Sequence, residues 1–401
     1  MDARDLANEK AASQRGRRPW YRNVGAAATV ALAGALAAGA LAAPVAGAAT
    51  AHAKAKGKPK ATANVYASVE KQLSGLEKPP SGVSLLETGS TLLYPLISAW
   101  AAHYPATHVT TAGTGSGTGI ADALNGTVQL GASDAYLPIS DPSNLLDIPL
   151  DVSAQQVDYN LPGVKGHLKL NAAVLNGMYN GTITKWNDPA IAALNKGVSL
   201  PATTVVPLHR SDGSGDTFMF TSFLDFQDPS SWVASSGGPN TSIHFPSVPT
   251  ALAEQGNGGM LAGCEKTTGC VAYIGISYLR SALKAGLGDA QLENGSGKYV
   301  LPTPGAISSE VASFQHIPST GAISLVNSKN AKFGYPIVNF EYAIVNANQS
   351  SSTTAQAIRA FLAWGMDPRN GSSSTYLTPI YFHPLAPGAM QIALNLLKKI
   401  Q

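Results

Sequence analysis

Three short segments of the sequence combine glycine with serine or threonine hydroxyls. They span residues 88–92, 113–119 and 210–217, and each stands between a β-like run and a helix-like run. A helix start offers backbone N–H groups without intrahelical partners, and its partial positive charge attracts anions. Three such turns, with Asp134 and Arg210 beside them, predict a small tetrahedral anion that is held from several sides.

Asp134 and Arg210 are the charged candidates for this site. Arg210 offers a planar fork of N–H donors that suits an oxyanion, and Asp212 is placed to hold that fork. Each also has a purely structural interpretation, because Asp134 can cap a turn and Arg210 can form a weak surface ion pair. The hydroxyls can be helix caps, a role that is compatible with anion binding. We interpret His108 and His209 as packing or loop residues.

The charge of the chain is concentrated at its N-terminus. The formal net charge of the 401 residues is +3, and only 13% of them are charged. Residues 1–53 hold six bases and three acids, which leaves 21 of each in the remainder. That balance argues against a nucleic-acid partner, which calls for a basic patch or stripe. An anion site must therefore be built from local donors.

Residues 1–53 are typical of an export signal. A basic stretch at 15–22 precedes the uncharged, alanine-rich run 25–43, and small residues at 49–53 offer a cleavage site. Arg17 and Arg18 loosely resemble a twin-arginine signal, and an uncleaved membrane anchor is the alternative. Residues 54–82 begin with lysine alternating with Ala, Gly and Pro, which predicts a flexible tether. We therefore expect an exported protein, either extracellular or associated with the cell envelope.

Two cysteines, Cys264 and Cys270, are the only ones in the chain. In an exported protein this pair predicts a disulfide that closes a tight loop. A metal site would need more ligands, and no cluster of His or Cys supplies them. We expect neither a metal nor a cofactor.

Strand-like and helix-like runs alternate along the folded part of the chain. Strands are predicted at 83–87, 109–112, 128–133 and 205–208, and helices follow the first, second and fourth of these. Pro95 falls in the first turn of its helix, where a missing N–H costs little. The order predicts an α/β protein with parallel strands and with ligand groups at their carboxyl ends.

These turns closely resemble those of the PstS family, the phosphate-binding proteins of ABC-type phosphate importers, and in particular its actinobacterial branch. The resemblance covers nearly all of residues 83–401. It rests on four motifs in family order, at 87–95, 113–117, 131–134 and 206–218, and on further matches at 256–260, 269–275 and 335–338.

The resemblance implies a two-lobe, periplasmic-binding-protein-like fold of type II, with the ligand in the cleft between the lobes. The first lobe would comprise residues 83–158 and 337–401, and the second residues 159–336. The implied partners are inorganic phosphate and the permease subunits of the importer, and we expect a monomer. Many relatives are lipoproteins, but this chain has no cysteine for lipid attachment, so it would be secreted or held by its N-terminal segment.

The family's phosphate contacts match a defined set of residues here. Asp134 is the expected selectivity residue, because its carboxylate can accept a hydrogen bond from the proton that phosphate carries near neutral pH and sulfate lacks. Many members have Thr where this chain has Asp216, which either accepts a phosphate proton or caps its own helix. The implied ligand set is Ser90, Thr91, Leu92, Ser116, Asp134, Arg210, Ser214, Gly215 and Asp216.

Other functions have weaker support in the sequence. Neither Ser116 nor Ser214 lies in a Gly-x-Ser-x-Gly turn, so no catalytic serine is indicated. The 113–119 turn lacks the Gly-Lys-Ser/Thr ending of a nucleotide-binding loop. Binding of another oxyanion or of a phosphate ester is the first alternative. A secreted phosphatase is the second, although neither a metal cluster nor an activated nucleophile is visible.

Overall fold

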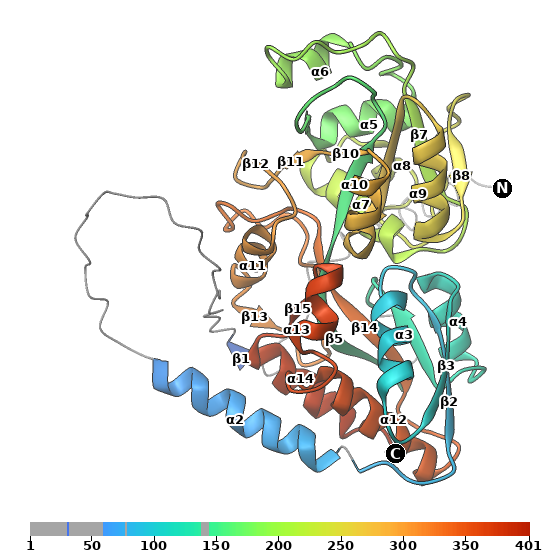
Figure 1. Cartoon of the computed structure of the whole chain (residues 1–401), viewed down its shortest axis with the longest axis vertical. Coiled ribbons are helices and arrows are strands. Elements are labelled where there is room, and N and C mark those ends of the chain that lie inside the picture. Colours follow the sequence, from blue (N-terminus) through green and yellow to red (C-terminus); the bar gives the residue numbers. More distant parts are fainter. Residues whose placement is uncertain (1–29, 32–58, 77, 138–143) are drawn as a thin grey trace, which may run out of the picture.

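The computed structural model of the chain describes residues 30–31, 59–76, 78–137 and 144–401. Two bodies of helices and strands lie one above the other in Figure 1. Among the described residues, ten strands form one mixed sheet that passes through both bodies, in the order β3-β2-β4-β14-β5-β9-β7-β8 with β10 and β15 attached to β5.

The lower body in Figure 1 begins with three parallel strands, β2 (Ser84–Gly89), β3 (His108–Gly113) and β4 (Leu130–Ser133). Helix α3 (Tyr94–His103) follows β2, and α4 (Ser116–Leu124) follows β3. The predicted strand, turn and helix order is thus confirmed here. Pro95 lies in the first turn of α3, as expected.

The upper body repeats this pattern. Strand β7 (Val206–Arg210) lies parallel to β8 (Leu252–Glu254) and to β9 (Cys270–Gly275). Helix α7 (Gly215–Gln227) follows β7, and α9 (Gly256–Lys266) follows β8. The remaining elements of this part are β6 (Lys169–Leu170), α5 (Ala172–Asn180), α6 (Pro189–Leu194), α8 (Trp232–Ser235), η1 (Ile276–Tyr278), α10 (Leu279–Lys284), β10 (Gly288–Asp289), β11 (Gln291–Glu293) and β12 (Tyr299–Val300).

Strand β5 (Leu145–Tyr159) joins the two bodies. It pairs with β14 (Val338–Asn346) as far as Ala154, and from Gln155 onward with β9. All of its residues are buried. Both pairings are antiparallel, so the prediction of a parallel sheet is wrong at the centre. The lobe boundary after residue 158 stays a prediction, and the change of partner in β5 favours a boundary between residues 154 and 155.

Helices of the C-terminal part cover the lower body. They include α12 (Ser352–Met366) and α14 (Pro387–Leu397), and both bury long apolar faces. Trp100 of α3 donates a hydrogen bond from Nε1 to Gly371 O at 2.9 Å and packs edge-on against Phe361 of α12. The other elements of this part are α11 (Pro304–Ala312), β13 (His316–Ile317), α13 (Ser374–Leu377), η2 (Thr378–Ile380) and β15 (His383–Pro384).

The predicted flexible tether is wrong over much of its length. Residues Pro59–Leu76 form helix α2, which packs along α12 and α14 (Figure 1). Val69 and Leu73 are fully buried, and Leu76 packs against the same core. Their spacing of four and three residues places them on one helix face. The Lys, Gly and Pro residues before them have the composition of a linker, so this helical spacing was overlooked.

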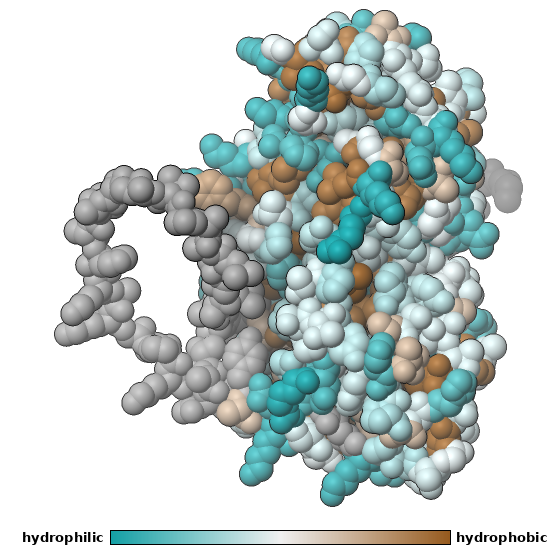
Figure 2. Space-filling view, viewed as in Figure 1, coloured by the Kyte–Doolittle hydropathy of each residue, from teal (hydrophilic) through white to brown (hydrophobic). Residues whose placement is uncertain are grey.

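The export signal predicted at 1–53 lies outside the described residues, apart from β1 (Val30–Ala31). That strand pairs with β13. Within the described ranges, no helix combines the length and the apolar character needed to cross a membrane. On the face in Figure 2, hydrophobic residues form small groups that white and teal residues separate.

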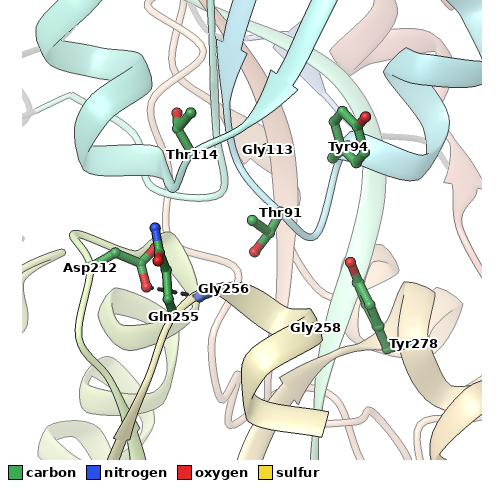
Figure 3. A pocket seen from close by; sticks show the side chains of 9 residues that line it. All are labelled: Thr91, Tyr94, Gly113, Thr114, Asp212, Gln255, Gly256, Gly258 and Tyr278. Carbon is green, nitrogen blue, oxygen red and sulfur yellow. Dashed lines mark hydrogen bonds between the residues drawn. The ribbon is translucent and has the colours of Figure 1, made fainter. Parts of the chain in front are cut away.

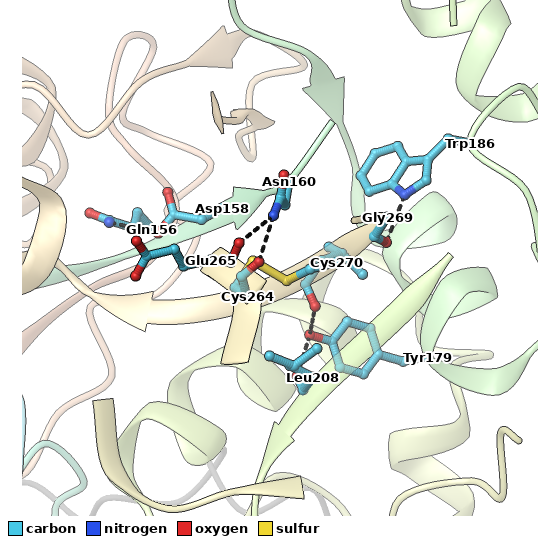
Figure 4. The surroundings of a disulfide bond; sticks show 11 residues. Gln156, Asp158, Asn160, Tyr179, Trp186, Leu208, Cys264, Glu265, Gly269 and Cys270 are labelled. Carbon is cyan, nitrogen blue, oxygen red and sulfur yellow. Dashed lines mark hydrogen bonds between the residues drawn. A yellow bond between two sulfur atoms is a disulfide. The ribbon is translucent and has the colours of Figure 1, made fainter. Parts of the chain in front are cut away.

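The predicted disulfide between Cys264 and Cys270 is confirmed. It links the end of α9 to the start of β9, and both cysteines are fully buried (Figure 4). Asn160 donates from Nδ2 to Cys264 O at 2.9 Å, and Trp186 donates from Nε1 to Gly269 O at 2.9 Å. The bridge and these bonds fix the turn that leads into β9.

A pair of buried acids lies near the end of β5. Asp158 stands directly opposite Asp289 of β10, and both are buried. Burial raises the pKa of Asp158 to about 7. Burial and the charge of Asp158 raise the pKa of Asp289 well above its usual range. The folded protein therefore holds protons here that the unfolded chain, with an aspartate pKa of about 3.9, releases at lower pH.

We predict that this pair makes the protein less stable as the pH rises. The stabilisation is complete below about pH 4 and is lost as the pH rises through about 7, with a total effect on the order of a few kcal/mol. Thermal unfolding of wild type and Asp158→Asn from acidic to alkaline pH measures it. The variant should show a shallower decline, and Asp289→Asn should behave alike. Superimposable profiles would contradict the prediction.

Candidate anion-binding site between the two bodies

The three glycine-rich turns meet where the two bodies face each other. Ser90 and Thr91 follow β2, Ser116 opens α4, and Asp134 follows β4, all from the lower body. The 210–217 turn comes from the upper body and reaches across. Gly117 N donates to Gly213 O at 2.9 Å, and a Cβ atom on Gly215 would lie 2.6 Å from Cβ of Asp134. The structure therefore brings the predicted site residues together.

Asp134 is buried and receives hydroxyl donors from both neighbouring turns. Ser90 Oγ donates to Oδ1, and Ser116 Oγ donates to Oδ2 at 3.2 Å. Ser90 Oγ in turn accepts from the backbone N–H groups of Leu92 and Leu93, at 3.1 and 3.0 Å. Burial raises the pKa of Asp134, while hydrogen bonds from Glu341, Ser90 and Ser116 and the charge of Arg210 oppose that rise.

Arg210 is held as a fork by two aspartates. Its Nε donates to Asp212 Oδ1 at 2.7 Å and its Nη2 to Asp212 Oδ2, while Nη1 donates to Asp216 Oδ2 at 2.9 Å. These contacts agree with the support that the sequence predicts for Asp212. Arg210 is only 5% exposed, which excludes the surface ion pair. Burial lowers the pKa of Arg210, but the two carboxylates outweigh it and raise that pKa above its usual value.

Asp216 does not cap its own helix. Ser214 takes that role, because its side chain accepts from Thr217 N at 3.4 Å. The Asp216 carboxylate instead accepts from Arg210 and, at 2.7 Å, from Asn257 Nδ2, while Gln155 Nε2 donates to its other oxygen at 3.1 Å. Burial and the charge of Asp134 raise its pKa to about 7, against the effect of Arg210.

Asn257 connects the two bodies, and sequence reasoning missed it as a site residue. Its backbone N and its Nδ2 both donate to Thr91 Oγ1 at 3.0 Å, and its Oδ1 accepts from Gly275 N at 2.7 Å. It follows Gly256, whose φ of +64° opens the turn into α9. This Gly-Asn-Gly-Gly stretch was a signal of the resemblance, but nothing in the sequence assigned it to the site.

Leu92 closes a second contact between the bodies. Ser277 Oγ donates to Leu92 O at 2.9 Å, and a Cβ atom on Gly275 would lie 2.5 Å from Cδ1 of Leu92. A side chain at 275 would therefore force Leu92 to move. Thr91 and Leu92 thus both contact the upper body.

A pocket of about 380 Å³ lies between the two bodies, with Asp212 in its wall (Figure 3). Thr91 and Asp212 belong both to its wall and to the network described above. It is lined from the lower body by Thr91, Tyr94, Gly113 and Thr114, and from the upper body by Asp212, Gln255, Gly256, Gly258 and Tyr278.

The histidines have no part in this network. His209 stacks on Phe245 with ring centroids 4.5 Å apart, which confirms its packing role. His108 contacts Thr110 at the exposed start of β3. In the described part of the chain, no three His, Cys, Asp or Glu side chains are grouped so that they could hold a metal ion.

Comparison with known proteins supports the resemblance to the PstS family. Residues 48–369 match the PBP superfamily domain. The phosphate-binding protein PstS of Methanocaldococcus jannaschii is 30% identical over 356 residues, which cover 82% of this chain and 89% of that protein. This chain belongs to the PstS family. PstS 2 of Mycobacterium tuberculosis is also 30% identical, over 63% of this chain and 70% of that protein. Membership of the actinobacterial branch stays a prediction.

Solved structures agree with this PstS fold. The phosphate-binding protein of Stenotrophomonas maltophilia is 18% identical and has a TM-score of 0.58, covering 77% of this chain and 92% of that one. The predicted two-lobe, periplasmic-binding-protein-like α/β fold is confirmed.

We predict that Asp216 titrates near neutral pH. Carbon-13 NMR of aspartate carboxyl groups should show a signal with a midpoint of about 7 that Asp216→Asn removes. Asp158→Asn serves as the control, because it should remove a different signal in that range. If the signal lost in Asp216→Asn titrates instead near about pH 4, burial does not dominate its pKa.

Proposed function

We propose that this PstS protein captures inorganic phosphate outside the cytoplasm and delivers it to the permease of an ABC-type importer. The observation that carries the proposal is the buried carboxylate of Asp134, placed among donors and opposite the upper-body turn that holds Arg210. A carboxylate in an anion site is useful when the anion itself carries a proton. Phosphate carries one near neutral pH and sulfate does not.

Donors for the phosphate oxygens are available on both sides of the site. The guanidinium of Arg210 has five N–H groups, and the bonds to Asp212 and Asp216 use three of them. The first N–H groups of α7, at Gly215 and Asp216, precede the first helical bond, which runs from Phe218 N to Ser214 O at 3.2 Å. Ser90, Thr91, Leu92, Ser116 and Ser214 complete the proposed ligand set.

Local donors, rather than net charge, would hold the ligand. The site contains one arginine and three aspartates, and the raised pKa of Asp216 keeps part of that negative charge neutralised near pH 7. The two bodies would close around phosphate as the lobes of a binding protein and exclude water from it. We infer a monomeric, exported carrier. We further infer that it has no catalytic activity, because the serines at the site hydrogen-bond to Asp134 or cap a helix, and no histidine among the described residues is bonded to them.

We predict that the full chain binds phosphate and discriminates against sulfate. Calorimetric titration with each anion measures this. Asp134→Asn should weaken phosphate binding by about 10- to 100-fold, the effect of one hydrogen bond to a charged group, and should narrow the gap to sulfate. Equal affinities of the wild type for both anions would overturn the selectivity argument. Other oxyanions and a phosphate monoester in the same titration test the alternative ligands.

We also predict that Gly215→Ala weakens phosphate binding, because the added methyl group would overlap the Asp134 side chain and hold the two turns apart. Gly305→Ala in α11 is the matched control, since a Cβ atom there meets nothing within 4 Å. The control should bind phosphate as the wild type does, measured by the same calorimetry. Equal affinity of the two variants would show that Gly215 need not approach Asp134 in the bound state.

A further inference from the structure

A third acid, Glu341, lies behind Asp134. It is on β14, which pairs with β4, the strand that ends just before Asp134. Its side chain is completely buried. Its Oε1 accepts from Ser153 Oγ of β5 and from Asn339 Nδ2 at 3.2 Å, and the same amide group donates to Asp134 O at 3.1 Å. Among the described residues, no donor is hydrogen-bonded to its Oε2.

Tyr342 of β14 lies opposite Ser133 of β4, so the register places Glu341 next to Asp134, and the amide of Asn339 bridges the two residues. The two carboxyl groups are therefore neighbours, and each acts on the titration of the other. Two carboxylates have no proton to share and repel each other, so this contact requires one of them to be protonated. The donors of Ser90 and Ser116 and the charge of Arg210 stabilise Asp134 as the anion. The groups that face Glu341 are Asp134, Ser153 and Asn339, and Tyr342 feels its charge. None of them is a cation.

The proton therefore resides on Glu341. Burial, together with the charge of Asp134, raises the pKa of Glu341 well above its usual range, in agreement with this placement. A protonated carboxyl group is a strong donor to a neighbouring carboxylate. Glu341 thus supplies the third side-chain donor to Asp134, after Ser90 and Ser116.

We propose that Glu341 is a positioning residue for phosphate selectivity, which acts by donating its proton in a hydrogen bond to Asp134. A carboxylate has about four acceptor positions, and the three protein donors occupy all but one of them. The remaining position would accept a hydrogen bond from the proton of a phosphate. The inference rests on the proposed phosphate-binding function.

Without its donor, Asp134 would change its role. A carboxylate that loses a hydrogen bond becomes more basic, so Asp134 would itself tend to take up a proton. Protonated Asp134 can donate to sulfate, and the distinction between the two anions would shrink. Glu341 therefore maintains specificity through Asp134 without contacting the ligand.

Two substitutions separate the donor from the charge. In Glu341→Gln the amide oxygen can accept from Ser153 and Asn339, and the amide N–H can donate to Asp134 at every pH. Glu341→Leu keeps the approximate size but removes the donor. Glu310→Gln is the control, because Glu310 is equally buried, has a pKa raised by burial to about 8, and lies in α11.

Calorimetric titration of each full-length variant with phosphate and with sulfate, from about pH 6 to 9.5, provides the test. We expect Glu341→Gln to bind phosphate as the wild type does at pH 7 and to keep its preference over sulfate. Glu341→Leu should lose about tenfold or more in phosphate affinity, with a smaller preference. At alkaline pH, the wild type should lose affinity more steeply than Glu341→Gln, because Glu341 then loses the proton that it donates and the amide keeps its donor. The titration of phosphate itself is common to both proteins. Glu310→Gln should follow the wild type.

The inference is overturned if Glu341→Leu retains phosphate affinity and preference, or if it loses affinity for both anions equally, as a merely structural residue would. If Glu341→Leu does not fold, the pH profiles decide, and identical profiles of wild type and Glu341→Gln overturn it. Failure of the wild type to bind phosphate would instead refute the proposed function.

Discussion

The site depends on a buried negative charge that must be hydrogen-bonded on every side. Asp134 is shielded from water by both bodies, so each of its lone pairs needs a donor from the protein or from a ligand. Ser90 and Ser116 meet this requirement from turns that belong to two different strands. Donors must replace the water that Asp134 has lost on burial. This need therefore constrains the positions of β2, β3 and β4 and of the helices that follow them.

Arg210 is a buried positive charge, and it too needs partners on every side. A buried guanidinium is tolerated only where carboxylates surround it, and Asp212 and Asp216 provide them. Asp216 is in turn bonded to Gln155 of β5 and to Asn257, which reaches Thr91 of the lower body. The polar network consequently runs without interruption from one body to the other, and its members stabilise one another's positions.

Sequence reasoning identified the residues whose chemistry is local. The Gly, Ser and Thr turns, Asp134 and Arg210 with Asp212 could be found because a strand end followed by a helix start has a recognisable pattern. Asn257, Gln155 and Glu341 could not, because their roles arise from pairing between distant segments. Glu341 is a single acid in the apolar run of β14, and only the register of β14 against β4 and β5 places it near Asp134. Helix α2 was missed for a different reason. Its polar start resembles a linker, and its apolar face is explained only by packing against α12 and α14.

The continuous strand β5 has a consequence for the lifetime of the closed state. A strand that is hydrogen-bonded and buried along its whole length can twist between its two partners, but it cannot act as a slack joint. Twisting of β5 would change the angle between the bodies while its two ladders stay paired. Opening would break contacts across the site, among them those from Asn257 to Thr91, from Ser277 to Leu92 and from Gly117 to Gly213. The rings of Tyr136 and Phe218 also meet between the bodies. We expect the residence time of a bound anion to depend on these contacts between the bodies. A partner that loosens them would accelerate release of the anion without touching it.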